Sequence, residues 1–513
     1  MNKNKNKNEI FSKPNTDKNT SNAQKHKKNS NHAIIFSSAV VCLLFICMSI
    51  FMVRYSMTHE IEMFDNSYNS YAKRLSKEYL RGKIYSSDGE ILAYSEGAST
   101  QEQSRVYPYA NMFAHAIGYS THGRMGVESI ANYYLLNYHS GIVNAAHANA
   151  ELEMLTADSV YTTLDTSLQQ IAYDSLGVYK GAVIITEVDT GRILAMVSKP
   201  DFDPNQIDQT WNEMLNDPEN TSLLNRVTQG LYPPGSTFKI ITTLEYLREN
   251  NGSYDGYGFN CTGSFTYDGN TIRCYHGSVH GGLDFPTSFA KSCNSSFANI
   301  GIGLDKDKFS KTLKDLMFEE ELPYDLPSSV SHTNISPELD SHNMMQASIG
   351  QGQDSISPLH LNMITCAIAN GGELMRPHLV DKVVSESGSD VKTFTSQSEG
   401  RLITEEESAK LTELMIGVVQ NGTAKRLKDL SYTAAGKTGS AEYSSATKDD
   451  SHAWFTGFAP AEDPQIAVTI IIEGAGSGGE YAVPIAKRMF DGYFAQNVNS
   501  EEPDQQENAA TDQ

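Results

Sequence analysis

An uncharged, apolar stretch from Ala33 to Val53 constrains the fold of this chain more than any other feature of its sequence. Its 21 residues match the roughly 20 residues that an α-helix needs to cross the hydrocarbon core of a bilayer. The apolar region of a cleaved signal peptide is shorter, about 7 to 15 residues, and ends at a small-residue cleavage site. We therefore expect one uncleaved transmembrane helix over residues 33–53.

Charge is distributed unequally on the two sides of this stretch. Residues 1–32 carry eight lysines against Glu9 and Asp17, whereas the whole chain of 513 residues has 40 Lys and Arg against 62 Asp and Glu. Positively charged flanks stay in the cytoplasm. This rule places the N-terminus inside the cell and residues 54–513 outside, in a single-pass protein of the cell membrane. A net charge of −22 also argues against nucleic acid as a partner.

Composition divides the rest of the chain into tails and folded segments. Residues 1–32 are rich in Asn, Lys and Ser, and residues 497–513 have five acids and no base, so we expect a disordered basic cytoplasmic tail and a disordered acidic tail. Residues 54–161 mix helical and short extended patterns and are interpreted as a small juxtamembrane pedestal module. Residues 162–496 have denser patterns and are interpreted as the main domain.

The main domain has strand patterns at both ends and helical patterns between them. At its first end a helical pattern over 164–176 precedes two apolar runs that flank the turn Asp189-Thr190-Gly191, which predicts a β-hairpin. Near the C-terminus, strand patterns lie at 432–443, 452–459 and 465–474, and a helical pattern follows at 481–495. One sheet must therefore collect distant strands, and we predict an α+β fold with helices against an antiparallel sheet.

A candidate nucleophile, Ser236, follows a Pro-Pro-Gly turn and begins an apolar-periodic segment that predicts a helix. Lys239 lies on the same helical face, where its amine can reach the serine hydroxyl and, if desolvated, act as the base. The helix N-terminus offers N–H groups to an oxyanion. The same spacing occurs at Ser70, Ser288 and Ser445, and a serine that merely caps a helix looks similar.

A second polar group consists of Ser292 and Asn294. In a helix these two side chains would not share a face, but in a short loop both can point into one cleft. The alternative is an ordinary loop, because Ser-x-Asn is common in loops and also occurs at Ser67.

A third polar group, formed by Lys437, Thr438, Gly439 and Ser440, interrupts a strand-like run. A glycine weakens the interior of a strand unless another backbone or a ligand must come close to it. The lysine and the two hydroxyls can hold a substrate carboxylate. A bulge in an edge strand is the alternative.

The order Ser-x-x-Lys, Ser-x-Asn, Lys-Thr-Gly is the motif set of penicillin-binding proteins and serine β-lactamases. On these motifs the chain resembles the monofunctional, class B penicillin-binding proteins over most of residues 80–494. Further matching stretches are Arg81-Gly82-Lys-Ile, Asp88-Gly89, residues 181–205, Gly350-Gln-Gly352 and AWFTGFAP. The resemblance implies the penicillin-binding, serine β-lactamase-like transpeptidase domain on a small N-terminal pedestal, with no glycosyltransferase domain.

The resemblance also implies an activity. Class B proteins are peptidoglycan D,D-transpeptidases that cross-link stem peptides through a serine acyl-enzyme, and β-lactams acylate the same serine. Ser236 would attack the carbonyl between the two terminal D-alanines, and Lys239 would take its proton. Ser292 would relay the proton toward the leaving amine, and Asn294 would hydrogen-bond the amide backbone of the substrate.

The Lys-Thr-Gly strand would hold the other end of the substrate. By the resemblance, Lys437, Thr438 and Ser440 bind the terminal carboxylate of the stem peptide. The backbone N–H groups of Ser236 and Ser440 would form the oxyanion hole. A donor peptide that lies along this strand as an added strand would account for Gly439.

The resemblance further implies that catalysis needs no cofactor and that the chain has a membrane-embedded SEDS-family glycosyltransferase as its partner. The module before Tyr161 is short for the family, so we expect no large N-terminal dimerisation or docking domain.

Four cysteines outside the apolar stretch raise a separate question. Cys261 and Cys274 can form a disulfide in an oxidising compartment. Alternatively, Cys261, Cys274, His280 and Cys293 supply three sulfurs and one imidazole, a set suited to tetrahedral zinc, although they lack a C-x-x-C spacing. Unpaired thiols are the third possibility. Because Cys293 lies inside Ser-x-Asn, a metal there would brace the cleft rather than take part in the chemistry.

Three rival functions share these residues. A β-lactam hydrolase or sensor of the class D type resembles the chain, but such proteins carry Val where this chain has Asn294. A D,D-carboxypeptidase would use water in place of the acceptor amine. A wall-binding scaffold without catalysis would not need the complete motif set.

Overall fold

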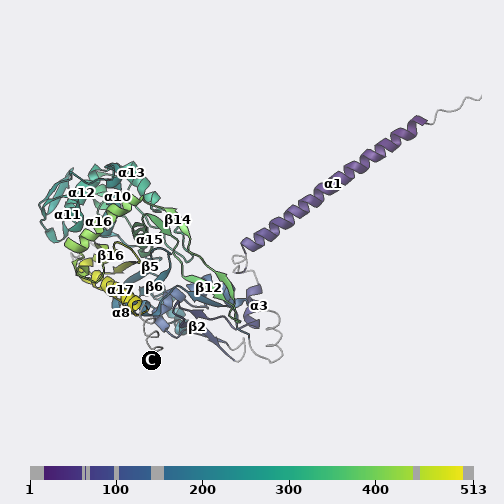
Figure 1. Ribbon diagram of the computed structural model, residues 1–513, viewed down its shortest axis with the longest axis horizontal. Coiled ribbons are helices and arrows are strands. Elements are labelled where there is room, and N and C mark those ends of the chain that lie inside the picture. Colours follow the sequence, from purple (N-terminus) through teal and green to yellow (C-terminus); the bar gives the residue numbers. More distant parts are fainter. Residues whose placement is uncertain are drawn as a thin grey trace, which may run out of the picture. The chain divides into compact units, whose positions relative to one another are not determined.

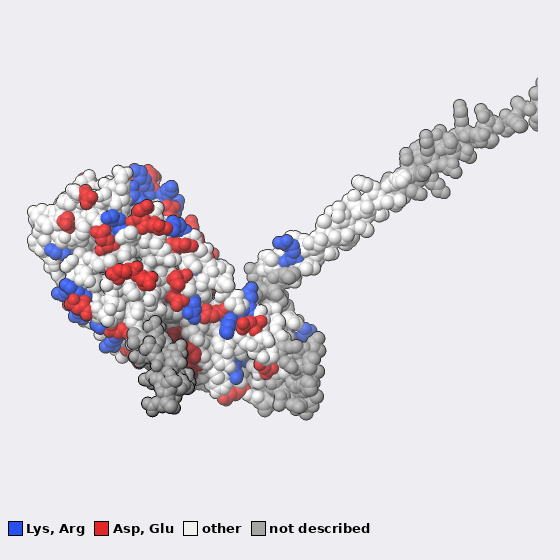
Figure 2. Space-filling model, in the orientation of Figure 1, with Lys and Arg blue, Asp and Glu red and all other residues white. Residues whose placement is uncertain are grey.

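A computed structural model describes residues 17–59, 64, 70–97, 103–139, 155–442 and 451–500. The chain divides into two units, residues 1–72 and residues 73–513. The first unit contains helix α1, Asp17–Thr58, in which the segment Ile34–Ser56 has a mean hydropathy of 2.7. Figure 2 shows a long part of this helix without charged side chains. A helix of this length and composition fits a single-pass membrane anchor.

Helix α1 begins earlier than the composition of the tail predicted. It starts at Asp17, so residues 17–32 are helical where we predicted disorder. The last proline before the apolar segment is Pro14, and no glycine or proline follows it in the tail. Once the apolar segment has formed a helix, each further residue adds one hydrogen bond without a new nucleation step. Residues 1–16 and 501–513 lie outside the described residues.

An antiparallel sheet of five strands, in the order β15-β16-β17-β5-β6, forms the centre of the second unit. The strands are β5 Gly181–Glu187, β6 Ile193–Lys199, β15 Ala435–Glu442, β16 Ser451–Ala459 and β17 Ile466–Ile472. The predicted hairpin and the three predicted C-terminal strands are therefore confirmed. The strands do come from distant parts of the chain, and β15 lies at one edge of the sheet.

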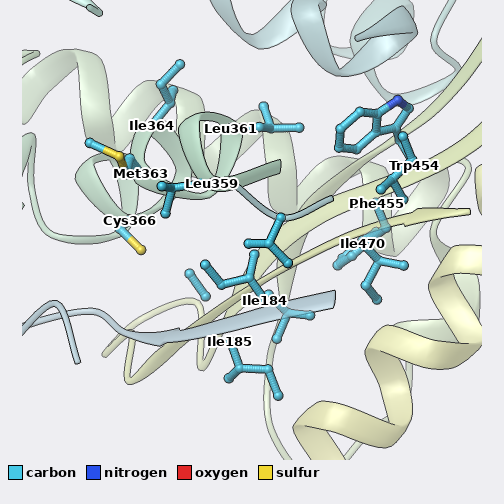
Figure 3. Close-up of a cluster of buried hydrophobic side chains, with 14 of the residues drawn as sticks. Ile184, Ile185, Leu359, Leu361, Met363, Ile364, Cys366, Trp454, Phe455 and Ile470 are labelled. Atoms are coloured by element: carbon cyan, nitrogen blue, oxygen red, sulfur yellow. The ribbon is translucent and has the colours of Figure 1, made fainter. Parts of the chain in front are cut away.

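Helices cover this sheet on both faces (Figure 1). Helices α8, Thr166–Leu176, and α17, Gly478–Ser500, pack together against it, and α15, Pro358–Ala369, packs against β5, β16 and β17. Figure 3 shows α15 beside the strands that carry Ile184, Phe455 and Ile470, with buried side chains drawn on both the helix and the strands. Successive residues of a strand point to opposite faces. Because neighbours such as Ile184 and Ile185 are both fully buried, the strands are continuous apolar runs rather than alternating ones.

A largely helical part continues the second unit and carries two of the three motifs. Its helices are α10 Lys239–Glu249, α11 Phe285–Ala290, α12 Asn294–Gly303, α13 Lys306–Asp315, α14 Ser341–Ala347 and α16 Glu405–Asn421. Short strand pairs join them: β7 Phe259–Cys261 with β10 Gly281–Leu283, β8 Ser264–Tyr267 with β9 Asn270–Arg273, and β11 Glu373–Met375 with β14 Ser398–Arg401.

The pedestal contains a second sheet, in the order β13-β12-β4-β1-β2-β3. Its strands are β1 Ile84–Tyr85, β2 Ile91–Glu96, β3 Ser104–Val106, β4 Ser159–Thr162, β12 Val380–Val384 and β13 Asp390–Thr393. The last two strands come from the range that we assigned to the main domain, 162–496. The division after residue 161 is therefore not a clean break, because β12 pairs with β4.

Short helices complete the pedestal and the connections around it. They are α3 Ser70–Glu78, α4 Ala114–Ile117, α5 Val127–Ile130, α6 Asn132–Leu136 and α9 Ile207–Asn216. A buried ion cluster joins α5 to β3 and to the segment before β1: Arg81 and Arg105 each lie within 2.7 Å of a different oxygen of Glu128. Glu128 is fully buried, so both guanidinium groups are needed to compensate its charge.

Candidate active site

Ser236 lies in a tight turn that packs against the edge strand. The turn, Gly235–Phe238, is a 3₁₀ helix, and α10 begins only at Lys239, so Ser236 precedes the α-helix that we expected it to open. Gly235 has a φ of +53°, and a Cβ added there would lie 2.9 Å from Cβ of Ala441 in β15. The left-handed backbone and the close approach both require glycine.

Lys239 is fully buried and donates three hydrogen bonds. Its Nζ lies 2.8 Å from the carbonyl oxygen of Ser292, 3.2 Å from Oγ of Ser292 and 2.7 Å from Oδ1 of Asn294. Burial lowers the pKa of this amine to about 7. Among the described residues Lys239 makes no hydrogen bond to Ser236, so the expected direct contact is replaced by contacts to the second motif.

Lys437 approaches the same hydroxyl from the sheet. Its Nζ lies 2.9 Å from Oγ of Ser292 and 3.0 Å from the carbonyl oxygen of Thr438, and its side chain is fully buried. Burial and the positive charge of Lys239 hold the pKa of Lys437 well below its usual range. Ser292 therefore accepts from two amines and keeps its own O–H proton free to donate.

Ser292 and Asn294 both line the cleft, as the short-loop interpretation required. Ser292 has a φ of +54°, and α12 begins at Asn294 with Cys293 as its N-cap. A non-glycine residue in this conformation is strained and needs surrounding contacts to hold it there. Here the contacts are the two lysines, and Nδ2 of Asn294 donates to the carbonyl oxygen of Arg273 at 3.2 Å.

The Lys-Thr-Gly residues occupy the edge strand β15, whose outer side is open to a further strand. Thr438 and Ser440 line the cleft together with Ser236. Oγ of Ser440 accepts a hydrogen bond from the backbone N–H of Gly478 at 3.3 Å. The edge strand therefore presents two hydroxyls beside the nucleophile, which is the arrangement that binding of a substrate carboxylate requires.

Gly439 has a different role from the one we expected. A Cβ added there would lie 3.0 Å from Cβ of Trp454, 3.1 Å from Cγ2 of Thr237 and 3.2 Å from the carbonyl oxygen of Pro234. All three belong to the protein, and two of them belong to the turn around Ser236. The glycine is therefore required because β15 packs against the turn of the nucleophile, and substrate clearance is not needed to explain it.

The cleft has a volume of about 1150 Å³ and collects residues from all three motifs. The sequence interpretation missed several residues that line it, including Thr423, Lys425 and Glu480. They lie on loops and helix ends without a recurring spacing. For Thr423 the only sequence signal is the Gly-Thr pair that follows a helical pattern.

The four predicted metal ligands lie together beside the second motif. The sulfur of Cys274 is 3.6 Å from the sulfurs of both Cys261 and Cys293, and the sulfur of Cys261 is 3.4 Å from Nδ1 of His280. The three thiols are buried and free, and all four ligand atoms lie within 4.8 Å of one another. The thiols of Cys261 and Cys274 do not form a disulfide in this structure.

Comparison with known families decides what this site belongs to. The penicillin binding protein transpeptidase domain matches residues 181–491, a range that contains all three motifs. The chain belongs to the penicillin-binding protein transpeptidase family. The peptidoglycan D,D-transpeptidase PbpA of Mycolicibacterium smegmatis is 30% identical over 440 residues, which cover 79% of this chain and 87% of that protein. PbpA of Mycobacterium tuberculosis is 31% identical over 444 residues, or 80% of this chain and 88% of that protein.

Solved structures of penicillin-binding proteins have the same fold. The ceftriaxone acyl-enzyme complex of penicillin-binding protein A from M. tuberculosis has a TM-score of 0.74 and 28% identity, and covers 81% of this chain and 99% of that one. The D,D-transpeptidase domain from Eggerthella lenta has a TM-score of 0.73 and 27% identity, and covers 82% of this chain and 99% of that one. The expected α+β transpeptidase fold is thus confirmed.

The comparison identifies the pedestal of this penicillin-binding protein. Residues 81–158 match the penicillin binding protein A dimerisation domain. We expected no large domain of this kind, and the match is a compact one that lies within the small pedestal module predicted at residues 54–161. A compact dimerisation domain fits within about 80 residues here because part of its sheet is supplied from elsewhere, by β12 and β13.

Proposed function

We propose that this chain is a membrane-anchored, serine-type peptidoglycan D,D-transpeptidase that β-lactams acylate. The observation that carries the proposal is the convergence of Lys239 and Lys437 on one hydroxyl beside Ser236, at an open strand edge. Buried amines with lowered pKa values are the form of lysine that can accept a proton near neutral pH.

The proposed chemistry uses these groups in two steps. Ser236 Oγ attacks the carbonyl of the penultimate D-alanine, its proton passes to the buried amines, and the bond to the terminal D-alanine nitrogen breaks. Ser292 gives its O–H proton to that nitrogen and is reprotonated by the amine that took the proton of Ser236, so that the amine becomes neutral again. In the second step the amine of another stem peptide attacks the ester, Ser236 recovers its proton, and a new amide bond joins the two peptides. Backbone N–H groups of Ser236 and Ser440 stabilise the oxyanion in both steps.

The test uses the full chain in detergent, with Ser236→Ala as the matched variant. A fluorescent penicillin should form an adduct on Ser236 that persists for hours, and the variant should remain unlabelled. With a donor stem peptide and an added D-amino acid, exchange of the terminal residue should exceed simple release of D-alanine. Rapid loss of the label would instead identify a β-lactam hydrolase, and release of D-alanine without exchange would identify a carboxypeptidase. Absence of label on folded protein would contradict the proposal altogether.

We also propose that Cys261, Cys274, His280 and Cys293 hold one structural zinc ion. Tetrahedral zinc with bonds of about 2.3 Å to sulfur separates its sulfur ligands by about 3.8 Å. The two observed separations of 3.6 Å fit this geometry, and the mixed sulfur and imidazole set is one that zinc prefers. The ion would hold the loop of Cys293 and so the positions of Ser292 and Asn294.

Elemental analysis of the purified full chain tests the zinc proposal. One zinc per chain is expected in the native protein and in Cys366→Ala, a control whose thiol is buried in α15 away from the cluster. Cys261→Ser should lose most of the metal. Native protein without zinc, or equal zinc in both variants, would contradict the proposal.

The anchor and the partner complete the proposal. Residues 1–32 would lie in the cytoplasm and residues after the span outside, where peptidoglycan is cross-linked, since the basic flank precedes the apolar helix. Fusion of reporters to either terminus tests this topology, and activity of an extracellular reporter at the N-terminus would refute it.

The resemblance supports a SEDS-family glycosyltransferase as the membrane partner, and co-purification of the full chain with such a protein tests it.

A further inference from the structure

We infer that Thr423 is a positioning residue for the substrate carboxylate. It lies in the cleft, outside the three motifs, two residues after the end of α16. Its hydroxyl oxygen is 2.5 Å from that of Thr438, the middle residue of Lys-Thr-Gly. The inference rests on the proposed function, because it assigns Thr423 to the carboxylate end of that substrate.

The backbone of Thr423 is held between two neighbouring segments. Its N–H donates to the carbonyl oxygen of Ala290 at 3.3 Å, near the end of α11 and two residues before Ser292. A Cβ on the preceding Gly422 would lie 2.2 Å from that same carbonyl oxygen. A Cβ on Gly479 would lie 2.7 Å from the carbonyl oxygen of Thr423 itself. The close contacts of Gly422 with Ala290 and of Gly479 with Thr423 thus fix the backbone of Thr423, and with it the position of its hydroxyl, relative to the second motif and to α17.

The position of this hydroxyl matters because a hydroxyl has only one proton. If Thr438 donates its proton to Thr423, it cannot donate to a bound carboxylate. If Thr423 donates to Thr438, the proton of Thr438 points away and is free for the substrate. A carboxylate is a stronger acceptor than a hydroxyl, so a bound substrate selects the second arrangement. Thr423 then strengthens the bond from Thr438 to the carboxylate without touching the reacting atoms.

The experiment compares two probes in the full chain: benzylpenicillin, which carries a carboxylate, and its methyl ester, which does not. Thr423→Val keeps the shape of the side chain and removes the hydroxyl. We expect the rate constant for acylation by benzylpenicillin to fall about ten-fold at low probe concentration, and the rate with the ester to fall less than two-fold. The loss should arise mainly in apparent binding, with little change at saturating benzylpenicillin. Thr423→Ser should restore the native ratio of the two rates.

The ratio of the two rates within one variant does not depend on how much of the protein is folded. If Thr423→Val is too unstable to study, Thr423→Ala should show the same change in ratio. An equal fall with both probes, or no fall with benzylpenicillin, would overturn the inference and leave Thr423 as a structural residue. Failure of the wild-type chain to react with either probe would instead refute the proposed function, so the two failures can be distinguished.

Discussion

Gly439→Ala tests why the third motif contains a glycine. The added Cβ would lie 3.0 to 3.2 Å from Trp454, Thr237 and Pro234, whereas ordinary contacts begin at 3.4 Å. The strand or the turn must therefore move by several tenths of an ångström. Trp454 cannot move freely, because it is fully buried and its Nε1 donates to the carbonyl oxygen of Pro233 at 3.0 Å.

The expected losses of stability and of acylation rate follow from this overpacking. A group forced into a full core costs about 1–3 kcal/mol of the free energy of unfolding. The same movement would separate the N–H groups of Ser236 and Ser440, which we propose as the oxyanion donors, and loss of one such donor slows acyl transfer by about 10² to 10³. Because the displacement is only partial, we expect acylation by fluorescent penicillin to slow by about ten-fold or more, together with a lower urea midpoint.

Gly417→Ala in α16 is the matched control, because an added Cβ there meets nothing within 4 Å. Helix propensity predicts that it stabilises the protein by up to about 1 kcal/mol and leaves acylation unchanged. A Gly439→Ala protein with native stability but reduced acylation would refute the packing argument and restore the explanation by substrate clearance. Native stability together with native acylation would refute both.

Three further predictions use other parts of the structure. The rate of acylation should rise with pH up to about 7 and should fall about ten-fold for each pH unit below 7, because only the neutral Lys239 amine accepts a proton. Labelling rates between pH 5 and 9 measure this dependence. A rate that does not change with pH would contradict the prediction. Arg81→Met should lower the free energy of unfolding by about 3 kcal/mol, because it leaves the buried Glu128 with one of its two ion-pair partners. Urea unfolding measures the loss, and Arg74→Met, on an exposed pair, is the control. If the proposed zinc ion holds the loop of Cys293, removing it with a chelator should slow acylation, and added zinc should restore the rate. An acylation rate that complete removal of zinc leaves unchanged would contradict this role.

The fold could be predicted where local pattern determines the element. The strands β5, β6, β15, β16 and β17 are continuous apolar or small-residue runs between clear turns, and they were found. The pairing of β12 with β4 could not be found, because it joins residues more than 200 positions apart and no local signal marks such a contact. The same reason explains why the pedestal seemed to end at residue 161.

Prediction of the site was limited in the same way, because sequence patterns indicated the motif residues but not their long-range contacts. The order of the three motifs, and the resemblance to penicillin-binding proteins that it carries, predicted Ser236, Lys239, Ser292 and Lys437 as site residues, whereas the spacing of a single motif such as Ser-x-x-Lys recurs elsewhere in the chain. The neighbours of Gly439 and the partner of Thr438 could not be predicted, because many sequences would place some residue beside them. Sequence spacing also suggested a contact between Lys239 and Ser236, whereas the amine is bonded to a loop more than 50 residues away.

The reactivity of the site is therefore a property of the fold rather than of any one motif. An exposed lysine has a pKa of about 10.4 and is almost entirely protonated at neutral pH, so it cannot serve as a base there. Lys239 and Lys437 differ from such a lysine only because both are fully buried and converge on Ser292. Two buried charges at one hydroxyl would repel each other, which favours the neutral form of at least one amine. Any change that admits water to either amine should thus reduce acylation even when all motif residues are intact.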